Sequence, residues 1–120
     1  QQTNGLLVTE ICNSVGSVWA DFNNDGWLDL FIANEGLNEL FMNNANGTFT
    51  KINSGSLMLD AGISVGCATA DYDLDGKTDL FVANADGHNF LYHNIDINEN
   101  NWIKIKLIGT LSNKSAIGTR

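Results

Sequence analysis

Short apolar runs separated by polar turns dominate the chain, and their length and composition predict strands. Gly, Asn and Asp interrupt the runs after about five residues, so no stretch keeps the period of an amphipathic helix. Residues 15–21 and 65–71 are mostly small or β-branched, which suits crowded inner strands. Residues 30–34 (LFIAN) and 80–84 (LFVAN) are almost wholly apolar, which is typical of strands covered on both faces.

The same order of strands occurs twice. A shift of fifty residues places Ser14–Asn34 on Ser64–Asn84 with 12 identical positions out of 21. At that shift a predicted third strand at 39–44 (ELFMNN) aligns with 89–94 (NFLYHN), so that Asn43 aligns with His93. Residues 46–52 (NGTFTKI) predict a fourth strand. We therefore predict an all-β fold made of β-propeller blades, as two four-stranded repeats at 14–63 and 64–95.

The two ends of the chain fall outside these repeats. Residues 4–11 (NGLLVTEI) begin like the fourth strand of the first repeat, so residues 1–13 are interpreted as the last strand of a preceding blade. Residues 102–108 (WIKIKLI) alternate as a strand does, after a polar linker at 96–101. The chain starts without Met or a basic leader, and we expect an internal or processed piece of a longer protein.

Each repeat contains one acidic loop, DFNNDGWLD at 21–29 and DYDLDGKTD at 71–79 (loop 1 and loop 2). Acidic or amide side chains occupy positions 1, 3 and 5, Gly occupies position 6, and Asp occupies position 9. Side chains at alternate positions point inward when the backbone curls around a centre, and the backbone carbonyl of position 7 can face the same centre. The predicted ligands are Asp21, Asn23, Asp25, Trp27 and Asp29 in loop 1 and Asp71, Asp73, Asp75, Lys77 and Asp79 in loop 2, with Trp27 and Lys77 acting through their carbonyls.

The ligand types indicate Ca²⁺ at two structural sites. Hard oxygen ligands suit Ca²⁺, whereas Mg²⁺ requires a tighter octahedron and zinc prefers His or Cys, which neither loop contains. An EF-hand would need Glu at position 12, where this chain has Ile32 and Val82, so Asp at position 9 must complete the site. The alternative is that Asp and Asn merely favour turns, but this does not explain seven carboxylates in two loops.

The overall charge agrees with this interpretation. The formal net charge is −8 and half of the 14 acidic residues lie in the two loops, which argues against nucleic acid or anionic lipid as a partner. No apolar run is long enough to span a membrane. The two cysteines, Cys12 and Cys67, have no metal-type spacing. We expect buried free thiols, with a disulfide between them as the alternative.

These loops and their flanking strands carry a family resemblance. ADFNNDGWLDLFIAN and ADYDLDGKTDLFVAN resemble FG-GAP repeats of the VCBS type, the calcium-binding blades also found in integrin α-subunit propellers. The resemblance covers roughly residues 4–95 and implies a β-propeller with Ca²⁺ held by the loop residues named above. Residues 101–120 (NWIKIKLIGTLSNKSAIGTR) are similar to the start of an ASPIC/UnbV domain, cut off at Arg120.

We expect a non-enzymatic, calcium-stabilised scaffold for protein or glycan interaction, as in cell adhesion, located at the cell surface, in the periplasm or outside the cell. The expected contact sites are the turns at Glu35–Glu39 and Asp86–Asn89 and the side chain of Trp27, whereas Trp19 is expected in the core. The alternative is the propeller part of a secreted polysaccharide-active enzyme, with His88 and His93 as acid–base candidates; a calcium sensor or buffer is a third interpretation. Two blades cannot bury their own faces, so we also expect homo-oligomers.

Overall fold

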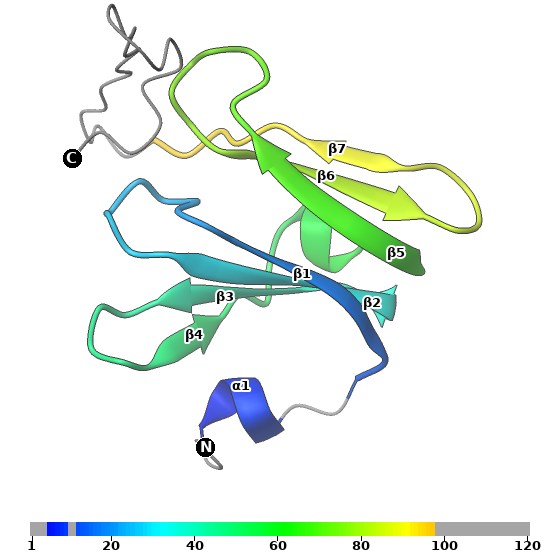
Figure 1. The fold of residues 1–120 in the computed structure, drawn as a ribbon, viewed down its shortest axis with the longest axis horizontal. Coiled ribbons are helices and arrows are strands. Elements are labelled where there is room, and N and C mark those ends of the chain that lie inside the picture. Colours follow the sequence, from blue (N-terminus) through cyan, green and yellow to red (C-terminus); the bar gives the residue numbers. More distant parts are fainter. Residues whose placement is uncertain (1–4, 10–11, 98–120) are drawn as a thin grey trace, which may run out of the picture.

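The computed structural model describes residues 5–9 and 12–97, and within them the fold is all-β. The first repeat contains four strands and the second contains three, each repeat running as an antiparallel meander (Figure 1). The strands are β1 (Ser14–Ala20), β2 (Asp29–Leu37), β3 (Glu39–Asn43), β4 (Phe49–Lys51), β5 (Ala61–Ala70), β6 (Asp79–Asn84) and β7 (Phe90–Tyr92). None of the helices in this part of the chain is long and apolar enough to cross a membrane.

One open antiparallel sheet links the two repeats. Its order is β4-β3-β2-β5-β6-β7, with β1 paired to β2 off this path. The long strand β2 serves both repeats, because its first part pairs with β1 and its last residues, Glu35–Leu37, pair with Ala61–Ile63 of β5. The predicted boundary between residues 63 and 64 therefore falls inside one continuous strand, β5, which leaves the first repeat and enters the second.

The core lies between the two repeats, whose strands face each other (Figure 1). Its buried residues are Phe31 and Ala33 from β2 and Leu80 and Val82 from β6. The strands β1 and β5 also approach closely, since a Cβ atom on Gly16 would lie only 3.6 Å from Cα of Gly66. The small residues that the two strands share therefore allow close contact between the repeats.

Two asparagines per repeat fix the turn between the second and third strands. The side-chain oxygen of Asn38 accepts a hydrogen bond from the Asn34 amide at 2.9 Å, and Asn89 does the same for Asn84. These pairs are four and five residues apart, so the second repeat has one extra residue in this turn. After it, equivalent residues are separated by 51 positions, and His93 corresponds to Met42 rather than to Asn43, which corrects the predicted alignment.

The prediction of a strand at residues 4–11 is wrong at Leu6–Thr9. Leu6–Thr9 form a single helical turn, α1, which contacts β4 (Figure 1). In the described part of the chain no strand pairs with this segment, and a helical turn satisfies its backbone groups locally. A second short turn, the 3₁₀ helix η1 (Ser56–Met58), lies between β4 and β5.

Three smaller predictions also need correction. Trp19 is 50% exposed and not in the core, because the face of β1 that carries it lies away from the second repeat. The centroid of its ring lies 5.9 Å from that of Phe49. Both cysteines are free, but Cys12 is exposed and Cys67 is only half-buried. The second repeat, predicted as four strands at residues 64–95, has three strands there, β5, β6 and β7. The segment at 101–120 lies outside the described residues.

Candidate metal-binding loops

The two acidic loops connect equivalent strands and close in the same register. Loop 1 joins β1 to β2 above the pair Ala20 and Asp29, and loop 2 joins β5 to β6 above the pair Ala70 and Asp79. Both loops need positive φ at the same two positions. Gly26 and Gly76 have φ of 90°, which glycine adopts without strain, and the residues two before them, Asn24 and Leu74, have φ of 56° and 65°.

The aspartate at position 9 connects each loop to the rest of its repeat. Asp29 is fully buried, and its two oxygens accept the amides of Phe22 at 2.9 Å and Asn43 at 2.8 Å. The corresponding carboxylate of Asp79 accepts the amides of Tyr72 at 3.1 Å and Asn94 at 2.9 Å. Each of these aspartates therefore holds the start of its loop against the end of the third strand.

Loop 1 is largely satisfied by its own hydrogen bonds. Both oxygens of Asp21 accept loop amides, from Asp25 at 3.0 Å and from Gly26 at 2.8 Å. The side-chain amide of Asn23 donates to Asp25 at 2.9 Å. Among the described residues, no three acidic side chains of this loop come together closely enough to share one ion.

Loop 2 gathers its carboxylates more tightly. Asp71, Asp73 and Asp79 each offer an oxygen, and these three oxygens lie within 4.8 Å of one another. The Oδ2 atom of Asp71 accepts the amide of Gly76 at 3.2 Å, but its Oδ1 atom is buried and has no hydrogen-bond partner. A buried carboxylate oxygen without a partner is costly, and a bound cation would remove that cost. The residues of loop 2 therefore fit a hard cation.

In loop 1 the group that would gain from a cation is the buried carboxylate of Asp29. Burial raises the pKa of Asp29, and the hydrogen bonds from Asn43 and Phe22 offset this only in part, while Asp25 and Asp21 raise it further. The exposed Asp75 differs, because the amide of Lys77 lowers its pKa, helped by the charges of Lys77 and His93. The carboxylate of Asp29 is thus expensive to charge without a nearby cation.

His93 is the residue of this region that the sequence did not place. Its Nε2 atom lies 3.0 Å from Asp73 and 3.7 Å from Asp75, both in loop 2. The assumed alignment with Asn43 made it look like a polar strand end, whereas the extra residue in the preceding turn moves it next to the loop. A count of residues between the paired asparagines would have revealed this shift.

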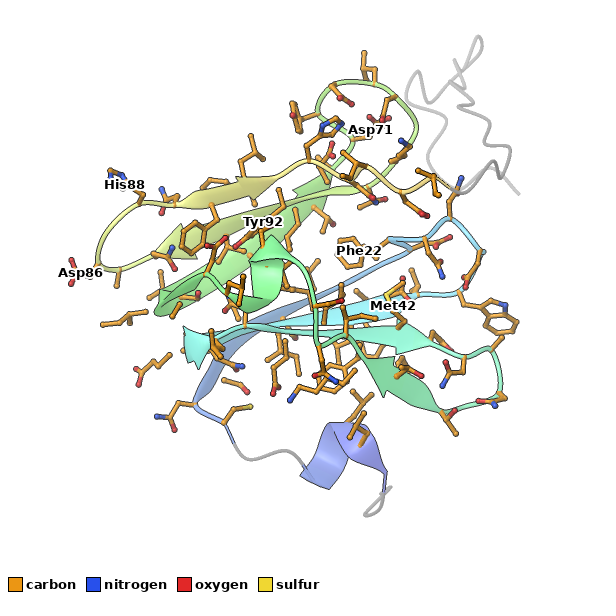
Figure 2. All side chains as sticks on the ribbon, turned by 180° about the vertical axis from the view of Figure 1, so that it is seen from behind. Phe22, Met42, Asp71, Asp86, His88 and Tyr92 are labelled. Atoms are coloured by element: carbon orange, nitrogen blue, oxygen red, sulfur yellow. The ribbon has the colours of Figure 1, made fainter. Side chains whose placement is uncertain are left out.

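Of the two segments predicted as contact turns, only Asp86–Asn89 is an exposed turn. Residues 35–37 of the expected turn Glu35–Glu39 belong to β2 and pair with β5, which removes them as a free loop. The turn Asp86–Asn89 is exposed, and Figure 2 shows Asp86 and His88 at the end of the second repeat opposite Asp71. The backbone carbonyl of His88 accepts a hydrogen bond from Asn84 at 2.6 Å. Trp27 is 51% exposed, as predicted.

The fold and the loops define a tandem β-meander protein whose repeats each carry one acidic hairpin loop. The model of one family, described as the FG-GAP-like repeat, matches residues 21–82, slightly more than half of the chain. The chain therefore belongs to the FG-GAP-like repeat family, which indicates a repeat scaffold. Searches of curated proteins and of solved structures found no match. The predicted similarity to ASPIC/UnbV is not supported.

Proposed function

We propose that this chain is a calcium-stabilised repeat scaffold that binds a protein or a glycan, without enzymatic activity, and that its repeats are blades of a β-propeller. The observation that carries the calcium proposal is the cluster of Asp71, Asp73 and Asp79 around the unpartnered Oδ1 atom of Asp71. Ca²⁺ takes six to eight oxygen ligands and accepts irregular geometry, which suits flexible carboxylates on a loop.

The residues that would hold the ion differ between the loops. In loop 2 they are Asp71, Asp73 and Asp79, together with Asp75 and the carbonyl of Lys77. In loop 1 they are Asp21, Asn23, Asp25 and Asp29 with the carbonyl of Trp27. The ion would neutralise carboxylates that otherwise repel one another and would hold each turn between its two strands. Loop 2 is the stronger candidate, because it has one more carboxylate.

The interaction surface would lie at the opposite end of the repeats from the loops, or beside loop 1. The turn Asp86–Asn89 is exposed and polar, and Trp27 presents a large aromatic side chain to solvent. Aromatic side chains with an exposed face suit binding to proteins and sugars. A location at the cell surface, in the periplasm or outside the cell follows as part of the proposal, because extracellular calcium modules have dissociation constants of about 10⁻⁴–10⁻³ M.

Calcium titration of the isolated chain tests the proposal. We expect heat of binding by calorimetry and a rise in the melting temperature when millimolar Ca²⁺ replaces EGTA, since a ligand that binds only the folded state stabilises it. Asp71→Asn should lose most of the effect, whereas Asp86→Asn, a matched change in the exposed turn, should keep it. Equal melting temperatures in Ca²⁺ and EGTA would contradict the calcium proposal.

A further inference from the structure

The contact between the two repeats joins two unlike faces. Alternate residues of a strand point to opposite faces of its sheet, so Phe31 and Ala33 share one face of the first repeat. They pack against Leu80 and Val82, which share one face of the second repeat, with Cys67 beside them. We call these the Phe31 face and the Leu80 face. The interface is therefore heterologous, because each repeat contributes a different face.

The second repeat has its own copy of the Phe31 face, and none of the described residues covers this copy. Phe81 and Leu91 pair across β6 and β7, as Phe31 and Leu40 pair across β2 and β3. Phe31 is 0% exposed, but Phe81 is 40% exposed and Leu91 is 59% exposed. Within the described part of the chain, this Phe81 face therefore lacks the partner that its counterpart has.

The first repeat has its own copy of the Leu80 face, and this copy contains a hollow. Leu30, Ile32 and Ser17 are the counterparts of Leu80, Val82 and Cys67. A hollow of about 330 Å³ lies over them, lined by Ser14, Val15, Gly16, Ser17, Trp19, Leu30 and Ile32. All of these residues come from β1 and β2 and none from α1. On the second repeat, the corresponding position is the one that packs against Phe31.

We propose that a second copy of this chain docks head to tail, with Phe81 of one copy in the hollow over Leu30 and Ile32 of the next. The chain carries both halves of this contact, and it already forms the same contact internally between its own repeats. Glu39 lies opposite Ile32 beside the hollow but pairs with Lys51 at 2.6 Å, and Asp79 on the face of Phe81 is buried. Docking therefore does not press exposed, unpaired acidic groups together despite the net charge of −8. Because the contact is heterologous, repetition of it leads to a closed ring or to an open chain of copies.

Sedimentation velocity over a range of concentrations, in millimolar Ca²⁺, tests this inference with two lysine variants. Phe81→Lys removes the inserted side chain, and Ser17→Lys obstructs the hollow. Lysine reduces the net negative charge, so neither variant can act by increasing the general repulsion between copies. Leu59→Lys is the matched control, because Leu59 is 80% exposed and lies outside both faces. Thermal unfolding of each variant checks that it is folded.

The wild-type chain and the Leu59→Lys variant should self-associate, and each of the other variants should weaken association at least tenfold. A mixture of Phe81→Lys and Ser17→Lys should form a one-to-one heterodimer and nothing larger, because one intact half remains on each chain. A symmetric dimer through two Phe81 faces would survive in Ser17→Lys and would overturn the proposal. A wild type that stays monomeric at every concentration would also overturn the proposal, because no second copy would then cover the Phe81 face.

Discussion

Loop 1 and loop 2 have the same length, the same register and a glycine at the same position, yet their carboxylates differ in the hydrogen bonds that they accept. In loop 1 the oxygens of Asp21 accept two loop amides, and Asn23 donates to Asp25. In loop 2 the carboxylate of Asp73 stands in place of that amide, and one oxygen of Asp71 is buried without a partner. The residue at position 3 is thus one of five differences between a loop whose first aspartate is satisfied by loop amides and a loop whose first aspartate has an oxygen left for a cation.

The difference continues at the strand ends. Asn34 and Asn84 occupy equivalent positions. In the second repeat the Ser64 hydroxyl lies 3.0 Å from the side-chain oxygen of Asn84. In the first repeat the equivalent Ser14 contacts Cys12 instead, and the side-chain oxygen of Asn34 has no hydrogen-bond partner. The extra residue before Asn89 places His93 beside loop 2. A repeated sequence thus keeps the backbone of the loop and changes the groups around it.

The largest loss of stability should come from replacing the aspartate at position 9 of either loop. Asp79→Ala removes the acceptor of two backbone amides, and Asp29→Ala does the same in the first repeat. Hydrogen bonds to a charged group contribute about 1.5–3 kcal/mol each, so we expect each variant to lower the free energy of unfolding by about 3 kcal/mol. Urea unfolding in EGTA measures this without any contribution from metal.

A surface aspartate provides the control for this experiment. Asp86→Ala in the exposed turn should change the free energy of unfolding by less than about 0.5 kcal/mol. A loss of similar size in Asp86→Ala and Asp79→Ala would show that the buried hydrogen bonds at position 9 do not hold the loops.

Exchanging position 3 should exchange the calcium affinities of the two loops. Because affinity depends on the number of charged ligands, Asp73→Asn should weaken binding at loop 2 about tenfold, and Asn23→Asp should strengthen binding at loop 1 about tenfold. Calorimetric titration of both variants measures the two constants. Unchanged affinity in both variants would mean that position 3 does not contact the ion. This result would contradict the ligand role of Asn23 and Asp73 without contradicting calcium binding.

The smallest effect should come from Tyr92→Phe, which gives the second repeat the residue that the first has at Phe41. The hydroxyl of Tyr92 lies 3.0 Å from Asp60, and its loss should cost about 1 kcal/mol near neutral pH. Figure 2 shows Tyr92 near η1, on the side of the second repeat that faces the first. Urea unfolding at several pH values measures the difference between the two proteins.

The sign of the pH dependence follows from the pKa of Tyr92. Burial, together with Asp60, raises this pKa above the ordinary value of 10.0, so the folded state favours the neutral phenol. The contribution is fully present below pH 10.0 and is lost as the pH rises beyond it. The wild type should therefore lose stability above pH 10.0 more steeply than Tyr92→Phe; parallel curves would contradict the role of this hydroxyl.

The sequence predicted the repeat, the loop positions and most strands, because each depends on local signals. The alternation of apolar residues, the paired Asp-Gly steps and the fifty-residue shift are all visible without a structure. It failed at Leu6–Thr9, where a segment predicted as a strand forms a helical turn, since a strand also needs a neighbour to pair with. It failed again at Glu35–Glu39, whose first three residues extend β2 to reach β5.

By itself the sequence determined that two acidic loops would close two equivalent hairpins, because the turn at Gly of position 6 and the bond from the second loop residue to Asp of position 9 are local to each loop. Only the tertiary structure decided which carboxylates meet, where His93 lies and which faces are covered. Those outcomes depend on one extra residue in a turn and on the stacking of one repeat against the other. Phe31 and Phe81 occupy equivalent positions in nearly identical strands, and among the described residues a neighbouring repeat covers the first but not the second.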